Sequence, residues 1–250
     1  MSDRAVSEMI GYILIFGIVI IAATTVFTKV HLMVSESKEN VRFESMVQGF
    51  RKIQSAVENV VYGKSQNKEL RILLSGGNLG ISNNNFLNVE VVVNNTTIFS
   101  DSLVMGGIEY EYEDYVMAFE SGGVWLKSFG KTTIISPPRI FIYKKTVNNE
   151  TIVFVAVTSL TGNGSAGGEG LVNINFALSS ASINLFNESG YVELRINSRY
   201  ADGWKKYFDE LRGYVNNTVL QTNLTGNNLN VSIYFDELVL ARYNITAKIW

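Results

Sequence analysis

The chain contains no cysteine and a single histidine, His31, among its 250 residues. Without thiols, disulfide frameworks and cysteine nucleophiles are excluded. With one imidazole, a zinc site built from several histidines is excluded as well. A serine nucleophile activated by histidine is equally hard to build, because His31 has no partner to form a catalytic set. The composition therefore favours a structural or binding protein over an enzyme, and we expect no catalytic residue, cofactor or metal site.

Charge is also scarce. Only 18% of the residues are charged, against 46% hydrophobic, whereas the usual charged share is roughly a quarter. The net charge of -2 argues against nucleic acid as a partner, because phosphates call for a concentrated basic face. The water-facing surface must therefore be built from uncharged polar side chains.

The strongest local signal is an uncharged run from Met9 to Thr28. At the helical rise it spans about 30 Å, the thickness of a bilayer core, and it is longer than the apolar region of a cleavable signal peptide. Apolar residues then recur at three- and four-residue steps up to Val61. We predict one helix from about Ser7 to Tyr62 that ends near Gly63.

The opening MSDRAVSEMIGYILIFGIVIIAATTVF, and the run VSEMIG above all, resembles the N-terminus of archaeal type IV pilin-like proteins. The resemblance implies that a prepilin-peptidase-like enzyme cleaves the short leader after Arg4 or Ala5. It also implies that the retained apolar helices pack into a filament core, and that Glu8 pairs with the new N-terminal amine of a neighbouring subunit. Glu8 lies one or two residues closer to the cut than in the bacterial pattern, and no glycine precedes it.

A plain signal anchor is the alternative, in which the helix holds a surface domain on the membrane and never polymerises. The flanking charges favour a cytoplasmic C-terminus weakly, because Lys29, Lys38 and Arg42 follow the span while Arg4 is offset by acidic neighbours.

Beyond Gly63 the period of the apolar residues changes from 3.6 to 2, and runs rich in Val, Ile, Tyr and Phe predict about ten strands. We expect an α+β protein: a long hydrophobic helix followed by a mainly antiparallel, β-sandwich-like domain. Asn94-Asn95, Asn148-Asn149, Gly76-Gly77, Gly106-Gly107 and Gly122-Gly123 are expected as turns. Apolar spacing from Tyr200 to Gly213 predicts one short amphipathic helix, capped around Asp202. The expected organisation is a leader (1–5), a helix (6–62) and a β domain (63–250).

N-x-[ST] glycosylation acceptors occur only beyond the helix. The acceptors are Asn94, Asn95, Asn149, Asn163, Asn187, Asn216, Asn223, Asn230 and Asn244. Their confinement to this region favours an exported, glycosylated face over the orientation that the flanking charges indicate. The alternative is that Asn, Ser and Thr only solubilise the turns of a charge-poor protein.

Two further motifs point to chemistry. Gly162 to Gly167 matches the G-x-G-x-x-G dinucleotide pattern, but an alternating strand follows instead of a helix, so we expect a hairpin loop. Glu109, Glu111 and Glu113 alternate with tyrosines and are followed by Asp114. They fit either a cation site or glycosidase-type acid pair, or, as we favour, a solvated strand face with the tyrosines toward the core.

The sequence thus predicts a structural subunit of an archaeal type IV pilus-like filament, with a role in adhesion. Its expected partners are other pilin subunits, the processing peptidase, a membrane platform with its ATPase, and lipid before assembly. The alternatives are a monomeric, membrane-anchored module that recognises glycans or a protein, and an extracytoplasmic hydrolase that uses paired carboxylates such as Glu111. In the filament and anchor cases the C-terminal domain faces outward, from the cell membrane or from an extracellular filament.

Overall fold

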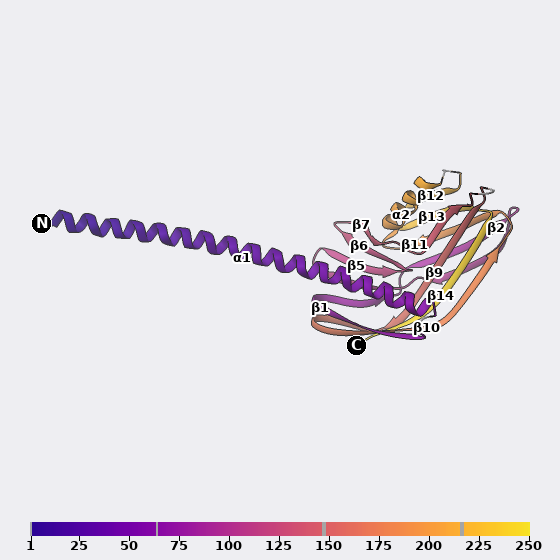
Figure 1. The fold of residues 1–250 in the computed structure, drawn as a ribbon, viewed down its shortest axis with the longest axis horizontal. Helices are drawn as coiled ribbons and strands as arrows, with labels where there is room; N and C mark the ends of the chain where they lie inside the picture. The colour runs from indigo at the N-terminus through magenta and orange to yellow at the C-terminus, as the bar shows by residue number, and fades with distance from the viewer. Residues whose placement is uncertain (1, 64, 147–148, 216–217) are drawn as a thin grey trace. The chain divides into compact units, whose positions relative to one another are not determined.

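The computed structural model describes residues 2–63, 65–146, 149–215 and 218–250. They group into two compact units, Met1–Ser45 and Met46–Trp250. The first is helical, and the second contains the end of the same helix, two β-sheets and a second short helix (Figure 1). The expected α+β fold class is confirmed.

Helix α1 (Ser2–Val61) is a single helix of 60 residues. Between Val30 and Tyr62 it contains one glycine, Gly49, and no proline, so nothing in this stretch breaks the hydrogen-bond ladder. It ends two residues before Gly63, whose φ of 70° is the left-handed conformation that glycine adopts most easily. The division between the two units falls inside α1, so residues 46–61 belong to the unit that contains the sheets.

Within this second unit, the last turns of α1 form part of the core. The buried residues recur at three- and four-residue steps, as in an amphipathic helix: Met46, Val47, Phe50, Ile53, Ala56, Val57 and Val60. Gly49 brings the helix close to the sheet, because a Cβ atom there would lie 3.3 Å from the side chain of Ile72. The helix is therefore a structural layer of the domain as well as its N-terminal extension.

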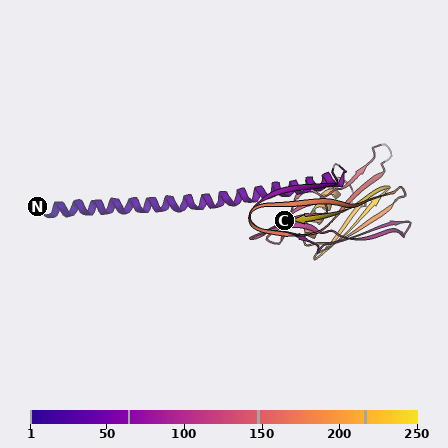
Figure 2. The same ribbon diagram turned by 90° about the horizontal axis from the view of Figure 1, so that it is seen from below.

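The larger sheet has nine strands in the order β7-β6-β5-β4-β1-β10-β14-β9-β8. In chain order its strands are β1 (Asn67–Ser82), β4 (Gly107–Tyr112), β5 (Tyr115–Glu120), β6 (Gly123–Ser128), β7 (Lys131–Ser136), β8 (Ile140–Lys144), β9 (Thr151–Asn163), β10 (Ser165–Phe186) and β14 (Glu237–Ile249). All neighbours pair antiparallel except β9 and β14, which are parallel. Figure 2 shows β14, in yellow, running among the other strands to the C-terminus.

The smaller sheet has five antiparallel strands in the order β12-β13-β11-β2-β3. In chain order these are β2 (Phe86–Val93), β3 (Thr96–Val104), β11 (Gly190–Asn197), β12 (Leu220–Thr225) and β13 (Asn228–Phe235). A large apolar cluster joins its buried side chains, such as Val89 and Ile233, to Val155 of the larger sheet and to Trp204. The two sheets therefore pack as a sandwich around one core.

Four strands were not predicted, namely β5, β6, β7 and β12. The end of β5 and the beginning of β6, from Met117 to Trp125, are buried continuously, so apolar and polar residues do not alternate there. Strand β12 has the opposite property, because it is mostly polar and presents few apolar side chains to the core. Period-2 patterning misses both kinds of strand.

The turn predictions had mixed outcomes. Asn94 and Asn95 form the expected two-residue turn with φ values of 51° and 59°. Gly76-Gly77 was wrong as a turn, because both residues lie inside β1 at a bulge where the pairing register with β10 shifts. Asn148 lies outside the described residues. The hairpin expected at Gly162 to Gly167 was wrong, because this motif connects β9 to β10, and these two strands do not pair with each other but lie on either side of β14.

Helix α2 (Ala201–Tyr214) lies where the sequence predicted a short helix, with Trp204, Tyr207 and Phe208 buried. The cap at Asp202 was wrong, because Tyr200 is the N-cap residue and makes no side-chain capping bond. Asp202 instead accepts a hydrogen bond from the backbone N–H of Thr132 at 2.7 Å. Burial opposes ionisation of Asp202, but its hydrogen bonds to Thr132 outweigh this and lower its pKa.

Candidate functional sites

The first candidate site is the uncovered apolar part of α1 in the first unit. Sixteen large apolar side chains between Tyr12 and Val41 are exposed, with exposed fractions from 47% to 74%. An 18-residue window of this helix is apolar enough to cross a membrane, and none of that window is buried. This helix is compatible with membrane anchoring or with a signal sequence. Burying such side chains stabilises by roughly 1.5–3 kcal/mol each, so covering this stretch with lipid or protein is energetically favourable.

The threonine side chains of this stretch form hydrogen bonds within the helix. The hydroxyls of Thr24, Thr25 and Thr28 each donate to the carbonyl oxygen four residues earlier, at 2.8 Å. Such bonds allow threonine to lie in an apolar environment, because no donor is left without an acceptor. Threonines within an apolar run are a signal for such bonds that the sequence already contains.

Arg4, Ala5 and Glu8 lie in the first turns of α1. His31 lies further along the helix and stacks on Phe27, with 6.3 Å between the ring centroids. The processing and pairing roles that the resemblance implies for the first three residues are therefore still predictions.

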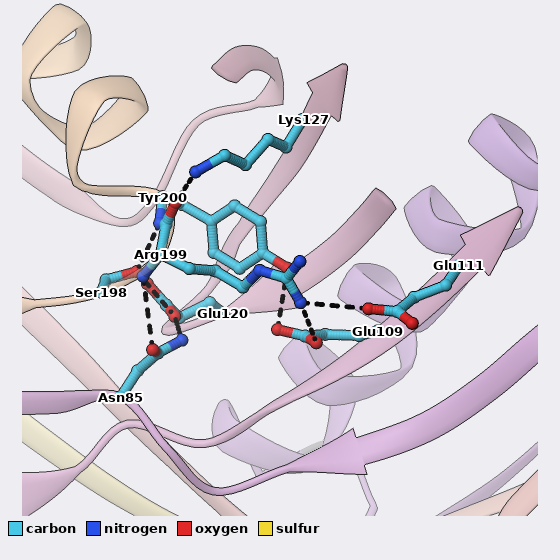
Figure 3. Close-up of polar contacts among 8 residues, drawn as sticks. All are labelled: Asn85, Glu109, Glu111, Glu120, Lys127, Ser198, Arg199 and Tyr200. Atoms are coloured by element: carbon cyan, nitrogen blue, oxygen red, sulfur yellow. Dashed lines mark hydrogen bonds and ion pairs between the residues drawn. The ribbon is translucent and has the colours of Figure 1, made fainter. Parts of the chain in front are cut away.

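The second candidate site is the carboxylate row on β4. Glu109 and Glu111 lie on the same face of the strand, and each accepts a hydrogen bond from Arg199 at 3.1 Å (Figure 3). Tyr110 is buried on the opposite face. Glu113 falls in the turn after the strand, where its φ is 46°, so the row contains two of the three alternating carboxylates. Within the described part of the chain, no group of three potential metal ligands is found.

Next to this row lies a buried carboxyl group, Glu120, at the end of β5. Only 1% of the surface of Glu120 is exposed. Its Oε1 accepts from Trp204 Nε1 at 2.7 Å and from Ser198 Oγ at 2.8 Å, and its Oε2 accepts from the Asn85 amide. Burial raises the pKa of Glu120 to about 7, although these three hydrogen bonds act in the opposite direction.

Tyr200 and Lys127 close the network around Glu109 and Glu120. The Tyr200 hydroxyl donates to Glu109 at 2.8 Å, and burial together with the Glu109 charge raises the pKa of Tyr200. Lys127 donates to the backbone carbonyl of Arg199 at 2.5 Å (Figure 3). These bonds join the loop before α2 to strands β4, β5 and β6. The role of Glu120 in this network was not predicted from the sequence, since one glutamate in an apolar run does not indicate which side chains it contacts.

The carboxyl groups of this network are all engaged by neighbouring side chains. Glu120 is enclosed by its three donors, and Glu109 is only 13% exposed in its side chain and is bound to Arg199. Glu111 is 56% exposed, and its carboxylate is also engaged by Arg199. An acid pair for hydrolysis needs both carboxyl groups to face a shared substrate space, whereas here Glu120 is buried and Glu109 and Glu111 both pair with Arg199.

The third set of candidates is the glycosylation acceptors. Every acceptor asparagine in the described part of the chain is exposed, on both sheets and on their connecting turns: Asn94, Asn95, Asn149, Asn163, Asn187, Asn223, Asn230 and Asn244. Asn216 lies outside that part. Asn230 and Asn244 are on strands, and both point away from the core, which is the condition for their use as acceptors.

Together the fold and these sites define an α+β protein with a membrane-compatible N-terminal helix and a β-sandwich domain. The family described as "Family of unknown function (DUF7289)" matches residues 4–248, and the chain belongs to this family. One uncharacterized protein from Archaeoglobus fulgidus is 29% identical over 275 residues, covering 89% of this chain and 88% of that protein. A second, from the same organism, is 25% identical and covers 84% of this chain and 83% of its own length. No solved structure matches.

Proposed function

We propose that this protein is a structural subunit of an archaeal type IV pilus-like surface filament, assembled through α1, with a role in adhesion. The observation that supports assembly most directly is the length of the uncovered apolar stretch. About 20 residues suffice to cross a bilayer, and the predicted span ends at Thr28. Exposed apolar side chains nevertheless continue through Leu32 and Met33 to Val41. Packing of helices against one another accounts for this continuation, whereas a plain anchor gives it no function.

The resemblance of the N-terminus to archaeal pilin-like proteins supports the same proposal, and the two relatives described above come from an archaeon. In this mechanism a peptidase removes the leader after Arg4 or Ala5. A platform and its ATPase then extract the helix from lipid, and Glu8 pairs with the amine of a neighbour. The β domains form the outer sheath, with exposed asparagines such as Asn163 and Asn244 available for glycosylation. No step of this mechanism requires catalysis by the chain itself.

The substitution Leu32→Glu tests assembly separately from membrane insertion. Residue 32 lies beyond the predicted span, so a carboxylate there leaves insertion intact but breaks helix packing in a filament. Ser37→Glu is the matched control, because at 100° per residue its side chain lies on a different side of the helix.

We expect immunogold electron microscopy to show filaments on cells that carry the native protein or Ser37→Glu, and none with Leu32→Glu, whose membrane content stays normal. Mass spectrometry of the native protein should show a new N-terminus at Ala5 or Val6. An intact Met1 end together with a lack of filaments on native cells would refute the proposal and favour the monomeric, membrane-anchored module.

A further inference from the structure

The outer face of the five-stranded sheet carries aligned rows of uncharged polar and paired charged side chains. The strand registers place Asn223, Asn230, Arg195 and Asn88 side by side across β12, β13, β11 and β2. The next row contains Gln221, Ser232, Glu193 and Glu90. The side chains in these rows are exposed or half-buried. Most of them end in a planar amide, carboxylate or guanidinium group.

A shallow groove of about 310 Å³ lies along these rows. Its side chains come from three adjacent strands, β11, β12 and β13: Glu193, Arg195, Gln221, Asn223, Asn230 and Ser232. This volume is at the lower end of small-molecule sites, and it is large enough for one or two sugar rings.

The charges along the groove are balanced. Arg195 Nη2 lies 3.1 Å from Glu90 and 3.5 Å from Glu193, so the guanidinium charge is offset by neighbouring carboxylates. A phosphate or sulfate group would meet these carboxylates, which disfavours an anionic ligand. A neutral ligand that offers many hydroxyl groups fits better, because amides and paired charges both donate to and accept from hydroxyls.

An aromatic pair adjoins the polar rows on the same face. Tyr191 and Tyr234 are register partners on β11 and β13, and their rings meet edge to face with 5.5 Å between centroids. Tyr191 is 46% exposed. An exposed aromatic ring offers an apolar surface to the C–H face of a sugar, next to groups that bind its hydroxyls.

We infer that this groove is a binding site for neutral oligosaccharides that belong to another molecule or surface. The inference deepens the proposed adhesive role by naming its site and its ligand class. Asn223 and Asn230 are also glycosylation acceptors and are register partners. The inference therefore requires both to be unmodified, since a glycan on either would fill the groove.

The test uses the full chain in detergent micelles, produced in a bacterial host without N-glycosylation. The protein is applied to an array of immobilised mannan, β-glucan and chitin oligosaccharides, with dextran sulfate as the anionic comparison. We expect binding to at least one neutral glycan and none that is specific to dextran sulfate. Asn230→Ala and Glu193→Gln should each weaken binding tenfold or more, and Ser232→Trp should block the groove.

The matched control is Asn244→Ala, because Asn244 is also an exposed acceptor asparagine on a strand but lies in the other sheet. It should bind as the native protein does. Equal binding by Asn230→Ala and native protein, no binding to any neutral glycan, or a glycan on Asn223 or Asn230 of the native protein would each overturn the inference. Filament formation by Asn230→Ala is followed in parallel, so that loss of glycan binding is distinguished from loss of assembly.

Discussion

Replacing Glu120 by glutamine should remove most of the pH dependence that this buried carboxyl gives to the stability of the β domain. In the folded state the pKa of Glu120 is raised to about 7, from a reference value of 4.5. Between these two values the folded protein holds a proton that the unfolded chain has released. The free energy of unfolding therefore falls as the pH rises through this window, and it is lower by a constant amount above it.

The size of the effect follows from the shift in pKa. One pKa unit corresponds to about 1.4 kcal/mol, so this carboxyl lowers the stability by about 3 kcal/mol between pH 4.5 and pH 7.5. Glutamine has no proton to lose, so Glu120→Gln should lack this decrease. Hydrogen bonds and nearby cations lower the pKa values of Asp202, Asp209 and Asp236 despite their partial burial. These groups destabilise the fold in acid equally in both proteins, and their effect cancels in the difference.

Urea denaturation of the full chain in micelles, followed by tryptophan fluorescence, measures this difference. Trp125 and Trp204 are both buried and in ring contact at 4.8 Å, and both donate hydrogen bonds to Glu120, so the signal reports on the site itself. Glu111→Gln is the control for loss of a negative charge in the same cluster, with an expected change within about 1 kcal/mol. Parallel stability curves for the native protein and Glu120→Gln across this pH range would refute the reasoning.

Two further predictions concern packing. Phe50→Ala should destabilise the β domain by about 3–5 kcal/mol, since Phe50 is fully buried. Phe16 is 66% exposed, so Phe16→Ala should leave the urea midpoint of the domain unchanged. Equal urea midpoints for the two variants would show that α1 is not part of the core. Gly106→Ala should lower the melting temperature strongly, because φ is 54° and a Cβ would lie 1.7 Å from the Leu160 carbonyl oxygen. Gly130→Ala has a similar φ of 74° with open space around it, so it should cost only about 1 kcal/mol, and the calorimetric difference between the two variants isolates the steric clash.

The sequence was sufficient for the elements whose pattern is local. The end of α1 near Gly63 and the helix around Trp204 follow from apolar spacing and one glycine, whereas α1 begins at Ser2 and not at the predicted Ser7. The pattern also located most strands that have one buried and one solvated face. What it could not supply was pairing between distant parts of the chain, including the parallel register of β9 with β14.

Side-chain contacts between distant segments also could not be predicted from local sequence patterns. Gln54 on α1 donates to the Gly122 carbonyl at 2.7 Å, and its Oε1 accepts from Ser136 at 2.6 Å. Three short segments far apart in the sequence meet there, and each has an ordinary polar residue that suggests no partner. The outer groove escaped prediction for the same reason, because its polar rows exist only once four strands are in register.

The position of β14 has a consequence for the order of events during synthesis. This strand is made after all the other described strands, yet it lies inside the larger sheet, between β10 and β9. At 5–20 residues per second, α1 is complete some ten seconds or more before β14 emerges. Until then β9 and β10 lack their shared neighbour, and Val61 at the end of α1 lacks Ala241 and Tyr243, against which it packs. A chain that lacks β14 therefore cannot complete its larger sheet, so synthesis must reach residue 249 before the domain can be presented.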